Sequence, residues 1–379
     1  MRLFILGWMM KFSIDKETFM GVLKRIDGVC PAKGSSFAAL ACCLIEARGD
    51  EIVVTGTDLE LTLRVIVNAN ILEEGKAIIH AHQLLDTVQC QPQDVPILIS
   101  SEGSQTFIDA GNFHGRISNI DISDYPQVDN LDYQECVRIN ALEFKSLITK
   151  TMFSISRDDS RIDFTGAFLT VKQNGKIEMV STDGHRLSRV ESMSSIVGTL
   201  NKNFETGVIL PKKALSEFSK YLTDGDIGLN CVGKKVIVSM GNTTYQITAI
   251  MGQFPDFSKV IPSKLDHKAI IRRDSFQQIL KRAAIFANKV AGTIRLTMSA
   301  GKLEISAFDS QKGEMRDFIE AEYEGAGVTA GFNWSYISDI LGVIDNEYVS
   351  LEIIDMDSPA VIRDITTDKL DFIVMPMQL

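Results

Sequence analysis

The sequence lacks the cysteine and histidine spacings that mark disulfide frameworks and metal sites. Its six cysteines are scattered, none with CxxC spacing, at Cys30, Cys42, Cys43, Cys90, Cys136 and Cys231. This pattern excludes a zinc ribbon and a disulfide scaffold and is typical of a reduced cytosolic protein. The five histidines form no HExxH motif or other ligand cluster, so we expect no metal.

Long apolar runs are also missing. No stretch approaches the roughly 20 apolar residues that a membrane span needs, and the apolar start MRLFILGWMM lacks a signal-peptide cleavage site. We therefore expect a cytoplasmic protein with no membrane partner. MKFSI opens a well-patterned unit, so we expect Met10 to be the natural start. Residues 1–9 are then an extension, either an alternative start or a disordered tail.

The chain contains neither a GxxxxGK[ST] loop nor a Rossmann glycine fingerprint, so we expect no cofactor. Its formal net charge of −10 argues, at face value, against a simple nucleic-acid binder. The length of 379 residues and the hydrophobic content of 45% predict a globular protein of two or three domains.

The sequence repeats itself. Three stretches, beginning at residues 11, 136 and 268, each read as an alternating strand, a polar turn and an amphipathic helix. We therefore predict three similar tandem domains over residues 10–134, 135–265 and 266–379. A second strand–turn–helix unit in each domain is predicted at 77–89, 208–222 and 328–341.

Each domain also contains a predicted hairpin, at 49–67, 174–191 and 301–323, with Asp58, Asp183 or Asp309 in its turn. Two helices packed on antiparallel sheets in each domain make an α+β fold. Three such domains in tandem would form an arc, and a head-to-tail dimer would close two arcs into a ring.

The stretch STDGHRLSRV (181–190) places Asp183 beside His185. One interpretation is a hydrolase using Asp183 and His185, with Ser181 or Ser188 as the nucleophile. The sibling hairpins read GTDLE and AFDSQ, without histidine, so a turn built by Asp and Gly is favoured. A tandem-domain interaction scaffold without a DNA role is the other alternative.

Basic residues gather on four of the six predicted helices despite the acidic total. They are Lys24, Arg25, Lys145, Lys150, Lys212, Lys213, Lys220, Lys281 and Arg282. If these helices line one wall, that wall would contact phosphates weakly and without reading bases.

Three motifs in a fixed order carry a resemblance to a known family. STDGHRL (181–187), FPDFSKVIP (254–262) and the terminal FIVMPMQL (372–379) resemble the bacterial DNA polymerase III beta subunit, the sliding clamp. The resemblance implies a DNA-clamp fold and a homodimeric ring that slides on double-stranded DNA without sequence specificity and catalyses nothing. It also implies a hydrophobic pocket that tethers the polymerase III alpha subunit, the clamp loader, other DNA polymerases and repair proteins through short hydrophobic motifs.

The resemblance assigns residues to three sites. The partner-peptide pocket would use Phe164, Thr182, Gly184, His185, Arg186, Leu187, Pro255, Val260, Ile373, Val374, Met375, Pro376, Met377 and Leu379. DNA contact is expected from Lys33, Lys150, Arg157, Arg161, Lys212 and Lys213. The dimer interface is expected at Phe107, Ile117, Ile285 and Phe286. Gln378 stands where family members usually carry arginine.

Overall fold

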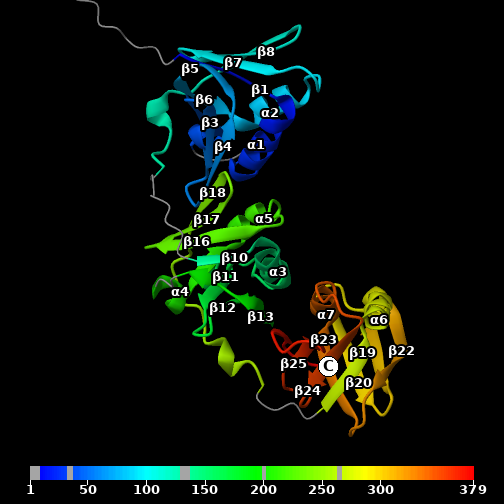
Figure 1. The fold of residues 1–379 in the computed structure, drawn as a ribbon. Helices are drawn as coiled ribbons and strands as arrows, with labels where there is room; N and C mark the ends of the chain where they lie inside the picture. The colour runs from blue at the N-terminus through cyan, green and yellow to red at the C-terminus, as the bar shows by residue number, and fades with distance from the viewer. Residues whose placement is uncertain (1–8, 32–36, 129–136, 199–201, 263–266) are drawn as a thin grey trace, which may run out of the picture. The chain divides into compact units, whose positions relative to one another are not determined.

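The computed structural model describes residues 9–31, 37–128, 137–198, 202–262 and 267–379 (Figure 1). Within it, the chain divides into two compact units, which are described separately below. The first unit comprises Met1–Asn140 with Ser216–Ala249, and the second comprises Ala141–Leu215 with Ile250–Leu379. The predicted extension at 1–9, apart from Met9, lies outside the described residues.

The N-terminal module contains two helices and nine strands within the described residues. Its elements are β1 (Met10–Ile14), α1 (Lys16–Val29), η1 (Ala38–Ala41), β2 (Cys42–Arg48), β3 (Glu51–Thr57), β4 (Leu61–Asn68), β5 (Asn70–Glu73), β6 (Gly75–His80), α2 (Ala81–Gln89), β7 (Ile97–Glu102), β8 (Gln105–Ala110), β9 (Phe113–Ser118) and η2 (Ile122–Asp124).

The middle module follows the same order and adds one short helix. Its elements are β10 (Val137–Asn140), α3 (Ala141–Met152), η3 (Ile162–Phe164), β11 (Gly166–Val171), β12 (Lys176–Thr182), β13 (Arg186–Ser195), β14 (Val197–Gly198), α4 (Lys202–Thr206), β15 (Val208–Pro211), α5 (Lys212–Ser219), β16 (Asp226–Val232), β17 (Lys235–Met240), β18 (Thr243–Thr248) and η4 (Phe257–Lys259).

The C-terminal module completes the repeat. Its elements are β19 (His267–Arg272), α6 (Arg273–Phe286), β20 (Thr293–Ser299), β21 (Lys302–Asp309), β22 (Gly313–Glu322), β23 (Val328–Asn333), α7 (Trp334–Leu341), β24 (Tyr348–Ile353), β25 (Ala360–Asp364) and β26 (Leu370–Val374).

All six predicted strand–helix units are present, and the reason is helical periodicity. In the first helix of each module, apolar residues that recur every three or four positions form one buried face. Phe19, Phe144 and Phe276 occupy corresponding places and are fully buried. The helices pack on their own module's strands: α1 contacts β3 and β4, α3 contacts β12 and β13, and α6 contacts β21 and β22 (Figure 1).

The strands form antiparallel sheets that run from one module into the next. In the first unit, β18 of the middle module pairs with β4 of the N-terminal module, opposing Tyr245 to Leu63. In the second unit, β13 pairs with β26, opposing Leu187 to Ile373, within a twelve-stranded sheet. Helices over extended antiparallel sheets confirm the predicted α+β class.

The three predicted hairpin turns share one hydrogen-bond pattern. In each, one carboxylate oxygen of the turn aspartate accepts hydrogen bonds from the backbone N–H groups two and three residues later. The aspartates are Asp58, Asp183 and Asp309. Such Asx turns satisfy backbone donors that a tight turn would leave without a partner. The interpretation of TDGH as a turn is therefore confirmed.

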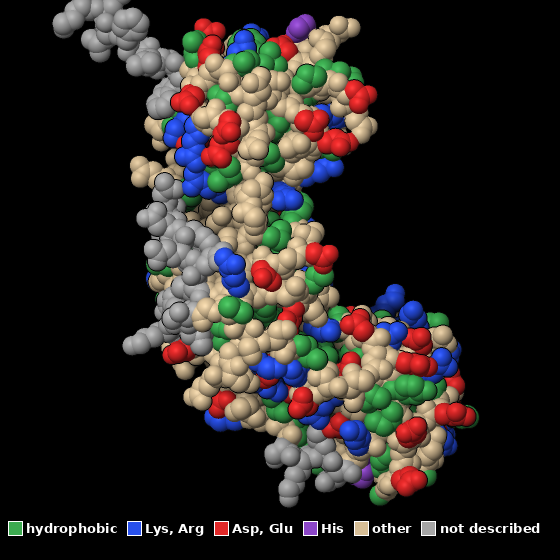
Figure 2. All heavy atoms as spheres, in the orientation of Figure 1, with side chains coloured by type: hydrophobic (Ala, Val, Ile, Leu, Met, Phe, Trp, Pro, Cys, Tyr) green, Lys and Arg blue, Asp and Glu red, His purple; other side chains and the backbone are tan. Residues whose placement is uncertain are grey.

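The surface mixes charge signs. Figure 2 shows cationic and anionic side chains interspersed over the C-terminal module, with hydrophobic side chains exposed among them. Several large apolar side chains of that module are exposed, including Phe308 and Phe318. Within the described residues, no helix is long and apolar enough to cross a membrane.

Candidate functional site

A cavity of about 180 Å³ lies in the second unit, where β13 and β26 meet the segment that precedes the C-terminal module. Its walls come from η3, the β12–β13 turn, β26 and the segment around η4. The lining residues are Phe164, Thr182, Gly184, Arg186, Leu187, Pro255, Asp256, Phe257, Val260, Ile373 and Met375. The lining is mostly apolar with a few polar groups, which is the character of a ligand site.

The cavity lies on a small hydrophobic cluster of the twelve-stranded sheet, which we call its floor; Leu187 and Ile373 of this cluster line the cavity directly. Four buried side chains from four adjacent strands form it: Val180, Leu187, Ile373 and Val361. Side chains of the 254–261 segment pack onto this cluster and are only partly buried. The floor is therefore held rigidly by strand pairing, whereas one wall is a loop.

Aromatic contacts hold that loop in place. The ring of Phe254 stacks on Phe168 with centroids 5.1 Å apart, and it lies 6.3 Å from both Phe164 and Phe257. The Arg161 guanidinium lies over the Phe164 ring, 3.8 Å from its centroid. Such contacts are worth about 0.5–1.5 kcal/mol each beyond area burial, so together they fix the wall without a covalent link.

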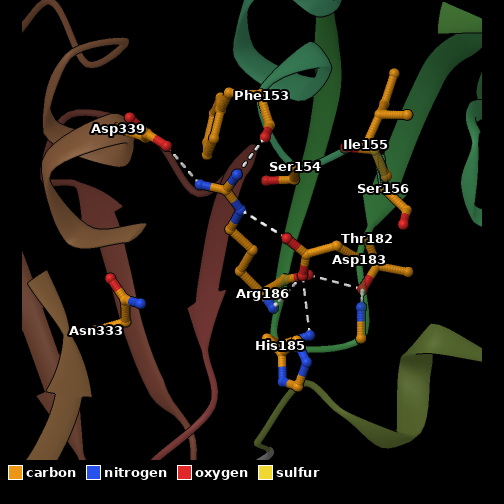
Figure 3. Close-up of polar contacts among 12 residues, drawn as sticks. Phe153, Ser154, Ile155, Ser156, Thr182, Asp183, His185, Arg186, Asn333 and Asp339 are labelled. Carbon is orange, nitrogen blue, oxygen red and sulfur yellow. Dashed lines mark hydrogen bonds and ion pairs between the residues drawn. The ribbon is translucent and has the colours of Figure 1, made fainter. Parts of the chain in front are cut away.

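Arg186 connects the β12–β13 turn to helix α7 (Figure 3). Its Nε donates to Asp183, one Nη donates to Asp339, and the other donates to the Phe153 carbonyl oxygen, at 3.0, 2.6 and 2.6 Å. The guanidinium also lies 4.5 Å from the Tyr336 ring centroid. Arg186 is thus held in one orientation at the cavity rim.

The same contacts argue against the hydrolase alternative. The Asp183 carboxylate accepts from the backbone N–H groups of His185 and Arg186 and from the Arg186 side chain, so it serves the turn. Ser181 is buried and donates to the Thr151 carbonyl oxygen, while Ser188 is buried against the Ser154 hydroxyl. Neither serine faces the His185 ring as an activated nucleophile would.

Nine of the residues expected in the pocket line the cavity: Phe164, Thr182, Gly184, Arg186, Leu187, Pro255, Val260, Ile373 and Met375. The other five lie outside its wall: His185, Val374, Pro376, Met377 and Leu379. Asp256 and Phe257 line it although they were not predicted. Both belong to the quoted FPDFSKVIP motif, so that motif carried a signal for them.

Strand geometry explains where the C-terminal residues lie. Side chains alternate along a strand, so Val374 faces away from the side that Ile373 and Met375 share. The Met377 N–H donates to the Gly331 carbonyl oxygen of β23 at 2.8 Å. Leu379 also lies near Gly331, because a Cβ added to that glycine would lie 2.8 Å from the Leu379 Cδ2. The chain end therefore runs along the C-terminal module beyond the cavity.

The residues expected to contact DNA have different surroundings. Lys33 lies outside the described residues. Lys150 forms an ion pair with Asp345 at 3.5 Å, and its side chain is only 17% exposed. Arg157 and Lys213 are exposed at the surface. Arg161 is exposed, and its guanidinium lies over the ring of Phe164, which lines the cavity.

Lys212 is the clearest sign of positive potential. Burial lowers the pKa of its ammonium group, the positive charges of Arg157 and Arg186 lower it further, and the Asp183 carboxylate acts in the opposite direction. Its Nζ donates a long hydrogen bond, 3.4 Å, to the Ile155 carbonyl oxygen. A cation whose pKa is lowered by neighbouring cations is stabilised by an incoming anion, so this cluster suits a phosphate.

The residues expected at the dimer interface differ in exposure. Ile285, near the end of α6, is 65% exposed, whereas Ile117 of β9 is 4% exposed and packs inside its own sheet. Phe107 and Phe286 are partly buried. Among the described residues, no group of three or more His, Cys, Asp or Glu side chains is placed to hold a metal ion.

Gly184 offers a test of how tightly the turn at the rim is built. Its φ is +89°, and an added Cβ would lie 2.8 Å from Nη1 of Arg161. We expect Gly184→Ala to cost about 1–3 kcal/mol of unfolding free energy, because it adds backbone strain and displaces Arg161 from Phe164. Urea denaturation of the full chain measures the change.

Gly241→Ala is the matched control for this substitution. Gly241 also has a positive φ, +56°, but an added Cβ would meet nothing within 4 Å. Its cost should be the backbone strain alone, about 1 kcal/mol. Equal costs at the two glycines would mean that the contact between Gly184 and Arg161 adds nothing.

The described geometry agrees with the comparisons to known families. Three family models match consecutive parts of the chain: the N-terminal, central and C-terminal domains of the DNA polymerase III beta subunit. The matches cover residues 10–129, 138–256 and 258–378.

Individual relatives match over nearly the whole chain. The beta sliding clamp of Pseudomonas aeruginosa is 30% identical over 98% of this chain and 100% of that protein, and the clamp of Escherichia coli K12 is 28% identical with the same coverage. A crystal structure of the P. aeruginosa subunit superposes with a TM-score of 0.91 at 29% identity, covering 98% of this chain and 100% of that one. Sliding clamps from P. aeruginosa and Bartonella birtlesii, 29% and 28% identical to this chain, have also been solved bound to griselimycin, with TM-scores of 0.90 and 0.91 over 98% of this chain and 100% of each of theirs.

The fold and the three consecutive matches lead to one conclusion: the chain belongs to the DNA polymerase III beta subunit family.

Proposed function

We propose that this chain closes into a head-to-tail homodimeric ring around duplex DNA in the cytoplasm and holds its clients at the cavity described above. As a member of its family it is a DNA polymerase processivity factor and not an enzyme. The clients we propose are the polymerase III alpha subunit, the clamp loader, other DNA polymerases and repair proteins.

The observation that carries this proposal is the match of all three modules, in order, to one family. Two local features support it. The cavity is apolar, partly walled by a loop and lined by Met375, whose flexible side chain adapts to different ligands. The cationic cluster around Lys212 and Arg157 suits phosphate contact.

Retention on circular DNA tests the ring directly. The full chain is loaded onto nicked circular DNA by a clamp loader with ATP and separated by gel filtration in high salt. We expect it to stay with the circle, because salt weakens phosphate contacts but does not open a closed ring. Cutting the circle with a restriction enzyme should then release most of the bound protein.

Two outcomes would contradict the proposal. Equal retention on circular and linear DNA would indicate ordinary binding and no encirclement. Absence from both in high salt, after loading in low salt, would fit a scaffold that meets DNA only through charge. Light scattering of the free protein, which should give the mass of a dimer, accompanies both measurements.

A further inference from the structure

A row of alternating charges crosses the twelve-stranded sheet beside the cavity. It runs through side chains on six adjacent strands and one neighbouring loop, and we call it the ion ladder. In spatial order its members are Lys172, Glu178, Arg189, Asp371, Arg363, Glu352 and Lys268. Positive and negative groups alternate along its whole length.

Asp371 of β26 is the centre of the ladder. One of its carboxylate oxygens accepts from Arg189 of β13 and the other from Arg363 of β25, both at 2.6 Å. The Asp371 side chain is only 5% exposed. The two arginines come from different modules, so this one carboxylate connects the middle module to the C-terminal module.

The ladder continues on both sides of this centre. On one side, Glu178 accepts from Arg189 at 2.6 Å and pairs with Lys172 at 2.9 Å. On the other side, Glu352 accepts from Arg363 at 2.5 Å and pairs loosely with Lys268 at 3.7 Å. Both glutamates are nearly buried. Each is paired with an arginine on one side and a lysine on the other.

The ladder lies on the same sheet face as the cavity floor. On β13, Arg189 follows Leu187 by two residues, and on β26, Asp371 precedes Ile373 by two. Residues two apart in a strand share a face. The pairs Leu187–Ile373 and Arg189–Asp371 are therefore neighbouring rungs of one pairing register.

We propose that the ion ladder fixes the pairing register of β26 and thereby places Ile373 and Met375 in the wall of the cavity. Arg189, Asp371 and Arg363 are then positioning residues of the pocket, although none of the three lines it. This inference rests on the proposed function in one respect, which is that the cavity is a ligand-binding pocket.

The sequence of β26 explains why such a device is needed. The strand reads LDFIV and every residue of it is buried, so apolar packing alone favours no single register strongly. A shift of one residue would turn Ile373 away from the floor, and a shift of two would set Asp371 against Leu187. Only the correct register gives the Asp371 carboxylate its two guanidinium partners. Buried ion pairs are weak stabilisers, and their best-attested role is to specify register.

The test compares Asp371→Leu with Glu191→Gln in the full chain. Asp371→Leu leaves Arg189 and Arg363 without their shared carboxylate, whereas Glu191→Gln removes a carboxylate of the same face that pairs with Lys172 and, at 4.0 Å, with Arg189, and leaves both arginine contacts of Asp371 in place. Hydrogen exchange of residues 370–377 is followed by mass spectrometry. The probe of the cavity is griselimycin, which two related clamps bind and which we propose that this cavity takes, and its affinity is measured by calorimetry.

We expect Asp371→Leu to speed exchange in this segment by about tenfold or more, and to weaken griselimycin binding by about tenfold or more. Glu191→Gln should change each by less than about twofold. Unchanged exchange and affinity in Asp371→Leu would overturn the inference. If the wild-type chain does not bind griselimycin, the proposed pocket fails, while the exchange data still decide the role of the ladder.

A variant with five substitutions separates register from stability. Arg189→Met, Asp371→Leu and Arg363→Met remove the centre of the ladder, and Glu178→Gln and Glu352→Gln remove the charge of the two buried glutamates that would otherwise lose their arginine partners. No buried charge of the ladder is then left without a partner, so the melting temperature should return close to that of the wild type. If the ladder fixes register, exchange in β26 stays fast and affinity stays low. Recovery of exchange and affinity together with the melting temperature would mean that the ladder contributes stability alone.

Discussion

Replacing Val260 by arginine should weaken the proposed binding of griselimycin to the cavity by about 100-fold or more, because it puts a long charged side chain into an apolar space of about 180 Å³. The guanidinium must either occupy the ligand's space or push the 254–262 segment away from the floor. Calorimetry with the full chain measures the loss. The fold should survive, because Val260 is only partly buried and lies just after η4, outside the strands.

Met251→Arg is the control for this substitution. Met251 lies just before the 254–262 segment, is 63% exposed and does not line the cavity. It adds the same side chain to the same loop, so it tests whether charge alone affects binding. Affinity within about twofold of the wild type is expected, since exposed substitutions away from a site are nearly neutral. A similar loss in both variants would place the binding site elsewhere.

Local chemistry made much of the fold predictable from sequence. Helical spacing of apolar residues predicted the six strand–helix units, and an aspartate in each hairpin predicted the turns. These features depend on residues within one turn of a helix or three positions of a loop. Strand alternation also determines that Val374 faces away from Ile373. The resemblance to the family placed both residues in the pocket because it did not take this alternation into account.

Contacts between distant residues were not predictable in this way. Lys150, expected to contact DNA, pairs with Asp345 of another module. The guanidinium of Arg161, also expected to contact DNA, lies over the Phe164 ring. The sequence predicted neither of these contacts. Asp371, Arg189 and Arg363 meet only because β26 pairs with β13 on one side and with β25 on the other. No period or spacing in one sequence indicates which strands become neighbours.

The cavity depends on the pairing between two modules. Its floor combines Val180 and Leu187 of the middle module with Val361 and Ile373 of the C-terminal module. Neither module can form the floor alone, because each supplies two of the four strands. Changes that loosen the pairing of β13 with β26 should therefore affect the ligand before they affect either module's own helices and strands.

The repeated phenylalanines should show how far each module is stable by itself. Phe19, Phe144 and Phe276 are fully buried in the first helix of their modules. The ring of Phe19 also packs edge-to-face on Phe12 of β1, with centroids 5.9 Å apart. Each phenylalanine-to-alanine change should cost about 3–5 kcal/mol through lost burial and a residual cavity. Because a multi-module chain need not unfold in one step, hydrogen exchange resolved by segment is the measurement.

Exchange should accelerate most in the module that carries the substitution. Phe144→Ala and Phe276→Ala should also loosen β26 and the cavity floor, since both modules supply strands to that sheet. Phe19→Ala lies in the other unit and should leave griselimycin affinity within about twofold. Phe308→Ala is the control, because that ring is 69% exposed and its loss should cost less than about 0.5 kcal/mol. Uniform acceleration over all three modules after any one change would show that the chain unfolds as a single cooperative body.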